Sequence, residues 1–193
     1  MSLSEGTSAK RGRPSPMMFV SIGIGAVIAI ALISVVSVLT GGKVTSGSAP
    51  VTSALQGKTI VNFSESGLNG GVEKAPWESH RPSVLVFFAS WCTVCQPEIP
   101  KVATYVSTHR LGRVEVLGVD AGDARSAARA FVKKNQVTFP VAFDPNDAVT
   151  AGLFDFDALP ETVFLSAKGV VESVHIGRIP IAQFASGIRQ LQS

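Results

Sequence analysis

The sequence predicts an α/β layer fold, and three observations support this. Strand-like apolar runs alternate with helix-like segments from about residue 54 onward. The turn Ser166–Gly169 separates two strand-like runs, and Gly is favoured where a hairpin needs a positive φ. Near the C-terminus, apolar residues recur at helical spacing and predict a helix packed on the sheet.

The first predicted elements surround a pair of cysteines. Residues 83–88 form a continuous apolar run, as expected of a central strand covered on both faces. A helix is expected to begin at Cys92, with Pro100 imposing a kink. The inner face of this helix from Cys92 would carry Ile99, Val102 and Tyr105. Residues 114–119 are expected to form a second buried strand.

The middle of the domain predicts two further helices. Asp123 is expected to cap a helix that ends at Asn135, ahead of a short strand over residues 139–143. Asp144 would then cap a brief helix through Val149 and Leu153.

The C-terminal part completes the predicted sheet and its cover. Strands over residues 162–165 and 170–176 flank the hairpin turn. The last helix is expected to cover the sheet with the apolar side chains of Ile181, Phe184, Ile188 and Leu191.

The N-terminal region predicts a membrane anchor. Residues 17–39 contain no charged side chain, and as a helix this run would be roughly 34 Å long, enough to cross a hydrocarbon core of about 30 Å. Basic residues precede it, so residues 1–16 are expected to be a cytoplasmic tail and the rest to be extracytoplasmic. A cleaved signal peptide is the alternative, although its apolar region is usually shorter.

The segment after the anchor predicts a flexible linker. Residues 40–53 are rich in Gly, Ser and Thr, which leaves residues 54–193 as the extracytoplasmic domain. The basic excess lies before this domain, because residues 44–193 hold 13 basic and 13 acidic side chains. No nucleic-acid partner is implied.

The two cysteines, Cys92 and Cys95, favour redox chemistry. At the start of a helix the first sulfur would be held as a thiolate nucleophile, and the second could resolve the mixed disulfide. An inert structural disulfide is an alternative. Haem attachment is disfavoured because Gln96 follows the second cysteine. No metal site and no cofactor beyond the cysteine pair are expected, because no ligand spacing links the cysteines to His80, His109 and His175.

Several motifs follow one another along the chain: Trp91-Cys92-Thr93-Val94-Cys95, the following Pro100, the Leu159-Pro160 step before a strand, and Gly177 before the last helix. With these motifs the chain resembles thioredoxin over almost the whole domain after the linker. Residues 120–154, with an extra helix and strand, and the phrase Cys95-Gln96-Pro97-Glu98 look more like the membrane-anchored TlpA-like branch. That branch includes the thioredoxin-like proteins of cytochrome c maturation. The resemblance implies a thioredoxin-like central mixed sheet flanked by helices, with a helix–strand insertion.

The resemblance also implies roles for four residues near the cysteines. Pro160 would form a cis peptide beside the disulfide, with Leu159 offering backbone hydrogen bonds to an extended partner. Trp91 resembles a docking tryptophan, and Glu98 a carboxylate that handles the proton of Cys95. Each has a simpler alternative: an edge-strand proline, a packing tryptophan, and a Glu that complements the helix dipole.

Three features depart from the thioredoxin pattern. Val86 stands where thioredoxin has a buried Asp, so another base must activate the second thiol. Thr93 and Val94 lack the common Pro between the cysteines. Asp155 and Asp157 precede the X-Pro step. Close to the disulfide they would disfavour a thiolate at Cys92, whereas as solvated loop acids, the favoured interpretation, they would have no effect on it.

The sequence therefore predicts an extracytoplasmic thiol–disulfide oxidoreductase. The expected partners are protein dithiols and disulfides, including apocytochrome c, together with a membrane electron-transfer partner and the lipid bilayer around residues 17–39. A reductase is the first hypothesis, and an oxidative folding catalyst is the second. A binding module with a structural disulfide and a peroxidase remain further alternatives.

Overall fold

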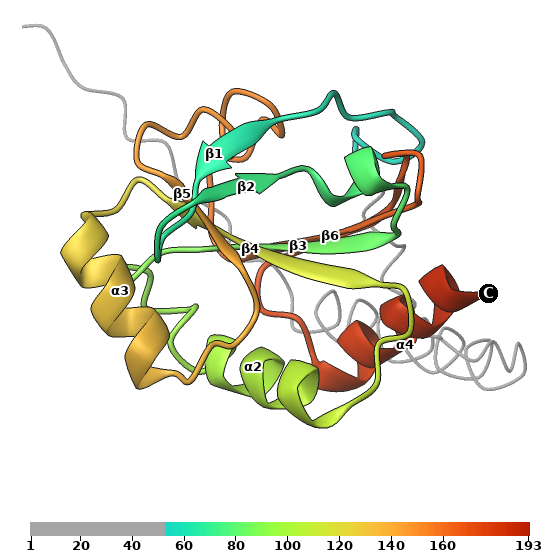
Figure 1. Ribbon diagram of the computed structural model, residues 1–193. Coiled ribbons are helices and arrows are strands. Elements are labelled where there is room, and N and C mark those ends of the chain that lie inside the picture. The colour runs from blue at the N-terminus through green and yellow to red at the C-terminus, as the bar shows by residue number, and fades with distance from the viewer. Residues whose placement is uncertain (1–52) are drawn as a thin grey trace, which may run out of the picture. The chain divides into compact units, whose positions relative to one another are not determined.

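The computed structural model describes residues 53–193, which form a five-stranded mixed sheet with helices packed on it (Figure 1). The strand order is β5-β4-β3-β6-β7. β3 is parallel to β4, and β4 to β5, whereas β3–β6 and β6–β7 are antiparallel. The strand bounds are β3 Ser83–Phe88, β4 Glu115–Ala121, β5 Val141–Asp144, β6 Glu161–Leu165 and β7 Val171–Ile176. The predicted α/β class and mixed sheet are confirmed.

The central strand β3 coincides with the predicted apolar run, and all of its side chains are buried. In register, Phe88 lies opposite Asp120 of β4, and Phe87 lies opposite Glu161 of β6. Alternate side chains point to opposite faces of the sheet and divide the core into two clusters. One cluster contains Val84, Val86 and Phe88, and the other contains Leu85 and Phe87.

The two faces of the sheet are covered differently (Figure 1). Residues of three helices pack in the core cluster of one face: α2 (Ile99–Thr108), α3 (Arg125–Lys134) and α4 (Ile181–Gln192). The other face is covered without an α-helix of the described chain. It carries the hairpin β1–β2 (Ser64–Ser66, Val72–Lys74), the 3-10 helix η1 (Pro76–Ser79) and the turns after β5. The prediction of helices flanking the sheet therefore holds for one face only.

The predicted helix start at Cys92 is wrong, because α2 begins at Ile99. Residues 93–98 form successive turns instead. Pro97 and Pro100 cannot donate the backbone hydrogen bonds that a helix from Cys92 would need. Pro100 lies in the first turn of α2, where a missing N–H costs nothing, so it does not act as an internal kink.

The brief helix predicted after Asp144 is also wrong. The Asp144 carboxylate does accept hydrogen bonds from the backbone N–H groups of Val149 and Thr150. The segment nevertheless forms turns, because Asp147 has a left-handed φ of 55° and interrupts a right-handed helix.

The C-terminal elements agree closely with the sequence. Gly169 has a φ of 73° in the β6–β7 turn, as the hairpin predicts. In α4, Phe184 and Ile188 are buried, but Ile181 is 38% exposed and does not join the core as predicted.

Within residues 53–193, no helix is long and apolar enough to cross a membrane. The predicted tail (1–16), anchor (17–39) and nearly all of the linker (40–53) lie outside the described residues, so these assignments stay predictions.

Candidate active site

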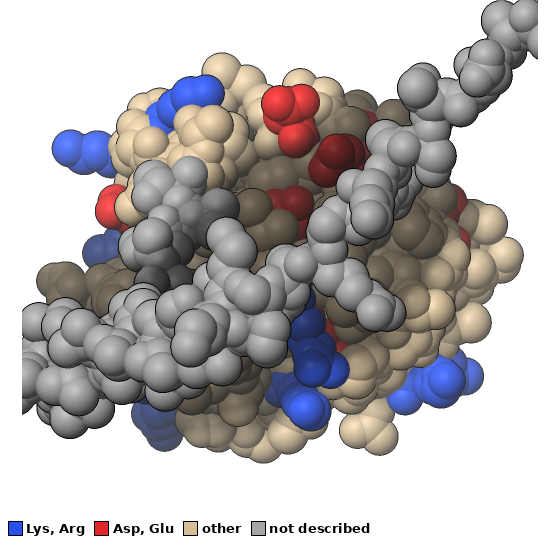
Figure 2. Space-filling model, turned by 180° about the vertical axis from the view of Figure 1, so that it is seen from behind, with Lys and Arg blue, Asp and Glu red and all other residues tan. Residues whose placement is uncertain are grey.

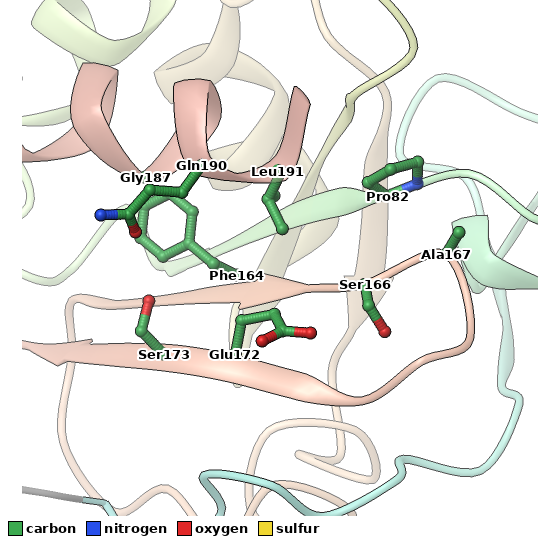
Figure 3. Close-up of a pocket in the computed structure, with 9 residues that line it drawn as sticks. All are labelled: Pro82, Phe164, Ser166, Ala167, Glu172, Ser173, Gly187, Gln190 and Leu191. Carbon is green, nitrogen blue, oxygen red and sulfur yellow. The ribbon is translucent and has the colours of Figure 1, made fainter. Parts of the chain in front are cut away.

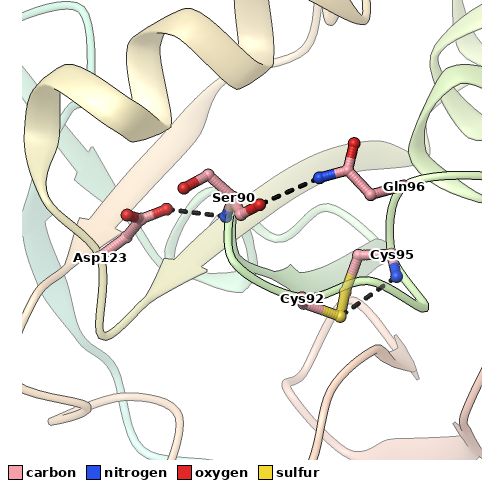
Figure 4. Close-up of a disulfide and its surroundings, with 5 residues drawn as sticks. All are labelled: Ser90, Cys92, Cys95, Gln96 and Asp123. Carbon is pink, nitrogen blue, oxygen red and sulfur yellow. Dashed lines mark hydrogen bonds between the residues drawn. A yellow bond between two sulfur atoms is a disulfide. The ribbon is translucent and has the colours of Figure 1, made fainter.

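The two cysteines form a disulfide just beyond the carboxyl end of β3 (Figure 4). Their sulfurs are 2.07 Å apart, and both side chains join the core cluster beneath the helices. Cys95 is fully buried, whereas Cys92 keeps an exposed fraction of 5%. A partner sulfur can therefore reach Cys92 more easily than Cys95.

The backbone between the cysteines provides a hydrogen-bond donor to Cys92. The Cys95 N–H lies 3.1 Å from Cys92 Sγ, within the turn that precedes α2. A donor aimed at sulfur favours the thiolate once the bridge is reduced. This local contact takes the place of the helix N-terminus that the sequence predicted there.

A hydrogen-bonded clamp holds the loop before the cysteines (Figure 4). Asp123 Oδ2 accepts the Ser90 N–H at 2.7 Å, and Gln96 Nε2 donates to the Ser90 carbonyl at 3.0 Å. The prediction that Asp123 caps α3 is wrong, because the helix has Ala124 at its N-cap and no side-chain cap. The carboxylate connects the β4–α3 loop to the cysteine loop instead.

Apolar surface surrounds the accessible cysteine. Trp91 is 61% exposed, and its indole N–H donates to the Gly122 carbonyl at 3.2 Å, which fixes the ring outside the core. Val94 is exposed as well. The docking role of Trp91 stays a prediction.

The Leu159–Pro160 peptide bond is cis, as the resemblance implies. Leu159 is half-buried and packs against the core cluster that holds both cysteines. Among the described residues, no group bonds to the backbone N–H or C=O of Leu159. These two groups are free to pair with an extended chain.

Glu98 is almost completely buried at the N-cap of α2. No described group meets hydrogen-bond geometry with either carboxylate oxygen. Burial raises the pKa of Glu98 to about 7, against smaller lowering effects of the nearby Ile179 N–H and the Arg178 charge. Its backbone N–H donates to the Cys95 carbonyl, which puts this carboxyl group one turn after the second cysteine.

A second buried carboxyl group, Asp120, escaped the sequence analysis. It lies opposite Phe88 in register and so shares a sheet face with the buried Val86, the position where thioredoxin has an Asp. Neither of its oxygens has a described partner. Burial raises the pKa of Asp120 to about 8, with further contributions from the charges of Asp123 and Asp144.

Asp155 and Asp157 lie exposed on the loop before Pro160. The charge of Asp157 acts on the side chain of Glu161, a buried carboxyl group that the sequence analysis missed. Burial, and then the Asp157 charge, raise the pKa of Glu161 to about 7. An Asp or Glu inside a strand was the one available signal for both Asp120 and Glu161.

Pockets also lie elsewhere on the described chain. No cluster of three or more His, Cys, Asp or Glu side chains within residues 53–193 is arranged to hold a metal ion. A pocket of about 330 Å³ between α4 and the β6–β7 hairpin lies at the opposite end of the sheet from the disulfide (Figure 3). Where its surface is uncovered, the face in Figure 2 shows acidic side chains mostly toward the upper middle and basic side chains at the upper left and along the lower edge, not one basic patch.

Comparison with known proteins supports this assignment of the site. The AhpC/TSA family profile matches residues 57–174. Thiol-disulfide oxidoreductase ResA of Bacillus subtilis is 31% identical over 93 residues, which is 48% of this chain and 51% of that protein. The chain thus spans about half the length of that relative. ResA of Geobacillus kaustophilus is 25% identical over 65% of this chain and 72% of its own length.

A solved structure agrees with the fold over most of the described region. The structure of MTB DsbF, in its mixed oxidized and reduced forms, superposes with a TM-score of 0.60 at 28% sequence identity. The match covers 67% of this chain and 94% of that one.

Proposed function

This chain belongs to the AhpC/TSA family, and from that premise we propose that it is a thiol–disulfide oxidoreductase acting on protein dithiols and disulfides. The observation that carries the proposal is the Cys92–Cys95 disulfide, with the Cys95 N–H directed at the more accessible sulfur. The relatives named thiol-disulfide oxidoreductases support the same reaction. They also favour it over a peroxidase or a binding module with a structural bridge.

The reaction proceeds by two exchanges. The Cys92 thiolate attacks one sulfur of a substrate disulfide, forms a mixed disulfide and releases the other substrate sulfur as a thiolate. Cys95 then loses its proton and attacks Cys92 Sγ, which expels the second substrate thiolate. The substrate gains two electrons, its two thiolates take up protons from solvent, and the Cys92–Cys95 pair is left oxidised.

Glu98 is the proposed base for the Cys95 proton. It follows Cys95 by one turn, it is buried, and no group within residues 53–193 meets hydrogen-bond geometry with its carboxylate oxygens. Its raised pKa of about 7 allows the group to take up and release a proton near neutral pH. In the proposed cycle it accepts the thiol proton when Cys95 attacks.

The proposed setting is the extracytoplasmic side of a membrane. The predicted anchor at residues 17–39 and the TlpA-like features support a reductase that serves cytochrome c maturation or other exported thiols. With only two cysteines in the chain, a membrane electron-transfer partner must regenerate the reduced pair.

Single cysteine variants test the reaction. A Cys95→Ser chain, reduced and mixed with a disulfide-bonded protein, should accumulate a mixed disulfide at Cys92, since the resolving thiol is gone. The matched Cys92→Ser chain should accumulate little, because Cys95 is fully buried. Equal, slow trapping by both variants would contradict the proposal and favour a structural disulfide.

The reduction potential of the cysteine pair decides the direction of electron flow. A value near about −270 mV, as in thioredoxin, supports a reductase, whereas a value near about −120 mV supports an oxidative folding catalyst. Equilibration of the chain with glutathione or dithiothreitol buffers, followed by thiol alkylation, measures it.

A further inference from the structure

A groove of about 620 Å³ lies against the core cluster on the sheet face opposite the α-helices. We call it the acidic groove. Its walls come from residues 53–61 and 153–158, and two strand residues, Glu161 of β6 and Ile176 of β7, complete it. The apolar core side chains at its base are Ile60, Phe154 and Phe156.

The charges that line the groove are unbalanced. Three acidic side chains, Asp155, Asp157 and Glu161, face one basic side chain, Lys58. Within the described chain, Lys58 forms no ion pair with any of them. The groove therefore offers negative charge to a cation from outside.

Glu161 gives this groove the character of a built site. Its side chain is only 4% exposed, and Oε2 is buried with no hydrogen-bond partner among the described residues. An unpaired buried carboxyl group costs folding free energy. Because Glu161 lines the groove, a cation bound there would supply the missing partner.

The position of the groove indicates a polypeptide as its occupant. Glu161 follows Leu159 by two residues, across the cis Leu159–Pro160 bond, and Leu159 is the residue whose backbone groups are free to pair with an extended chain. The rim also exposes two apolar side chains, Val61 and Ile176, which suit the methylene stem of a long side chain.

We propose that the acidic groove is a substrate-specificity subsite that binds the cationic side chain of a Lys or Arg in the polypeptide whose disulfide is exchanged. Glu161 provides the buried counter-charge, and Asp157 adds to it at the rim. The assignment rests on the proposed oxidoreductase function and extends it to the sequence around the substrate cysteine.

Paired peptides test the subsite. One member of each pair is a disulfide-linked peptide with Lys at a position one to four residues before or after its half-cystine. The other member has uncharged norleucine at the position of that Lys. The full chain is reduced and the kcat/KM for each peptide is measured. At the position that reaches Glu161, we expect the Lys peptide to be preferred by about tenfold, mainly through KM, as for a charge-assisted contact.

Three variants assign the preference to its residues. Glu161→Gln should bring the Lys-to-norleucine ratio close to one, and Asp157→Asn, on the exposed rim, should lower it about threefold. Glu172→Gln is the matched control, because Glu172 lies on the neighbouring strand β7 and lines the distant pocket of Figure 3. It should keep the full ratio. Since Asp157 is exposed, its variant stays informative even where Glu161→Gln lowers stability.

The outcomes separate this proposal from the proposed function. Equal kcat/KM for both peptides at every position overturns the subsite and leaves the oxidoreductase function intact. If neither peptide is reduced, the proposed function fails. The subsite is then tested by binding alone: fluorescence anisotropy measures the Kd of Lys and norleucine peptides in which Ser replaces Cys, and the Lys peptide should again bind about tenfold more tightly. If butylamine competes at concentrations similar to the Kd of the Lys peptide, the groove recognises a free amine and the polypeptide assignment is overturned.

Discussion

Asp120 and Asp144 are buried carboxyl groups near the ends of two neighbouring strands, yet their surroundings are opposite. Asp144 Oδ2 accepts three hydrogen bonds, from the Val149 N–H and from the N–H and hydroxyl of Thr150. Asp120 has no described partner. Burial alone therefore does not tell whether a carboxylate holds the surrounding backbone in place, whereas its hydrogen bonds do.

The carboxyl groups without partners are not scattered. Of the described residues, Glu98, Asp120 and Glu161 have buried carboxylate oxygens with no hydrogen-bond partner. All three lie at the end of the sheet that carries the disulfide, and burial raises the pKa of each. Perturbed groups of this kind concentrate at functional sites, so the pattern supports the assignment of this end as the active one.

The largest effect in this comparison is expected at Asp144. Asp144→Ala leaves two buried N–H groups and a hydroxyl without an acceptor, and we expect it to lower the free energy of unfolding by about 4 kcal/mol. Urea denaturation near pH 7 measures this. A loss below about 1 kcal/mol would show that the hydrogen bonds of Asp144 do not hold the turns after β5.

Asp120→Asn should act in the opposite direction. The folded pKa of Asp120, about 8, is above its ordinary value of 3.8, so the folded state keeps a proton that the unfolded state loses. The contribution of Asp120 to the free energy of unfolding of the parent is complete below pH 4. It falls as the pH rises toward 8, by at most about 1.4 kcal/mol per pH unit. Between pH 5 and pH 7 the free energy of unfolding of the variant should therefore rise by about 2 kcal/mol relative to that of the parent.

Urea denaturation of Asp120→Asn at several pH values provides this test. A stability difference from the parent that does not change with pH would mean that Asp120 ionises normally in the folded chain. Asp144→Asn, the same substitution at the hydrogen-bonded position, is the control and should destabilise the chain.

Glu98→Gln should have the smallest of these effects, and it should act on the rate of the resolving step. The resolving attack of Cys95 in the parent should accelerate as Glu98 ionises through pH 7. The variant should be about tenfold slower near pH 7 and lose that inflection, because its amide cannot take the thiol proton. Stopped-flow resolution of a preformed mixed disulfide measures the profile. An unchanged inflection would assign the proton to another group, with Asp120 the next to examine.

The sequence by itself determined the order along the chain of the five strands of the main sheet, though not the β1–β2 hairpin, and the position of the cysteine pair. The apolar run at residues 83–88, the hairpin turn at Gly169 and the spacing of Cys92 and Cys95 are local patterns, and local patterns are directly readable. They were enough to predict the α/β class, the central strand and the redox pair.

Only the tertiary structure decided which buried carboxyl groups of the strands lie at the same end of the sheet as that pair. Asp120 and Glu161 lie on strands that are distant from Cys92 in sequence, and sheet register brings them to the same end. Asp123, predicted as a helix cap, instead bonds to Ser90, which lies 33 residues earlier in the chain. Burial and hydrogen bonding set the proton affinity of a carboxyl group, and both come from residues far away in sequence, so local patterns could not supply them.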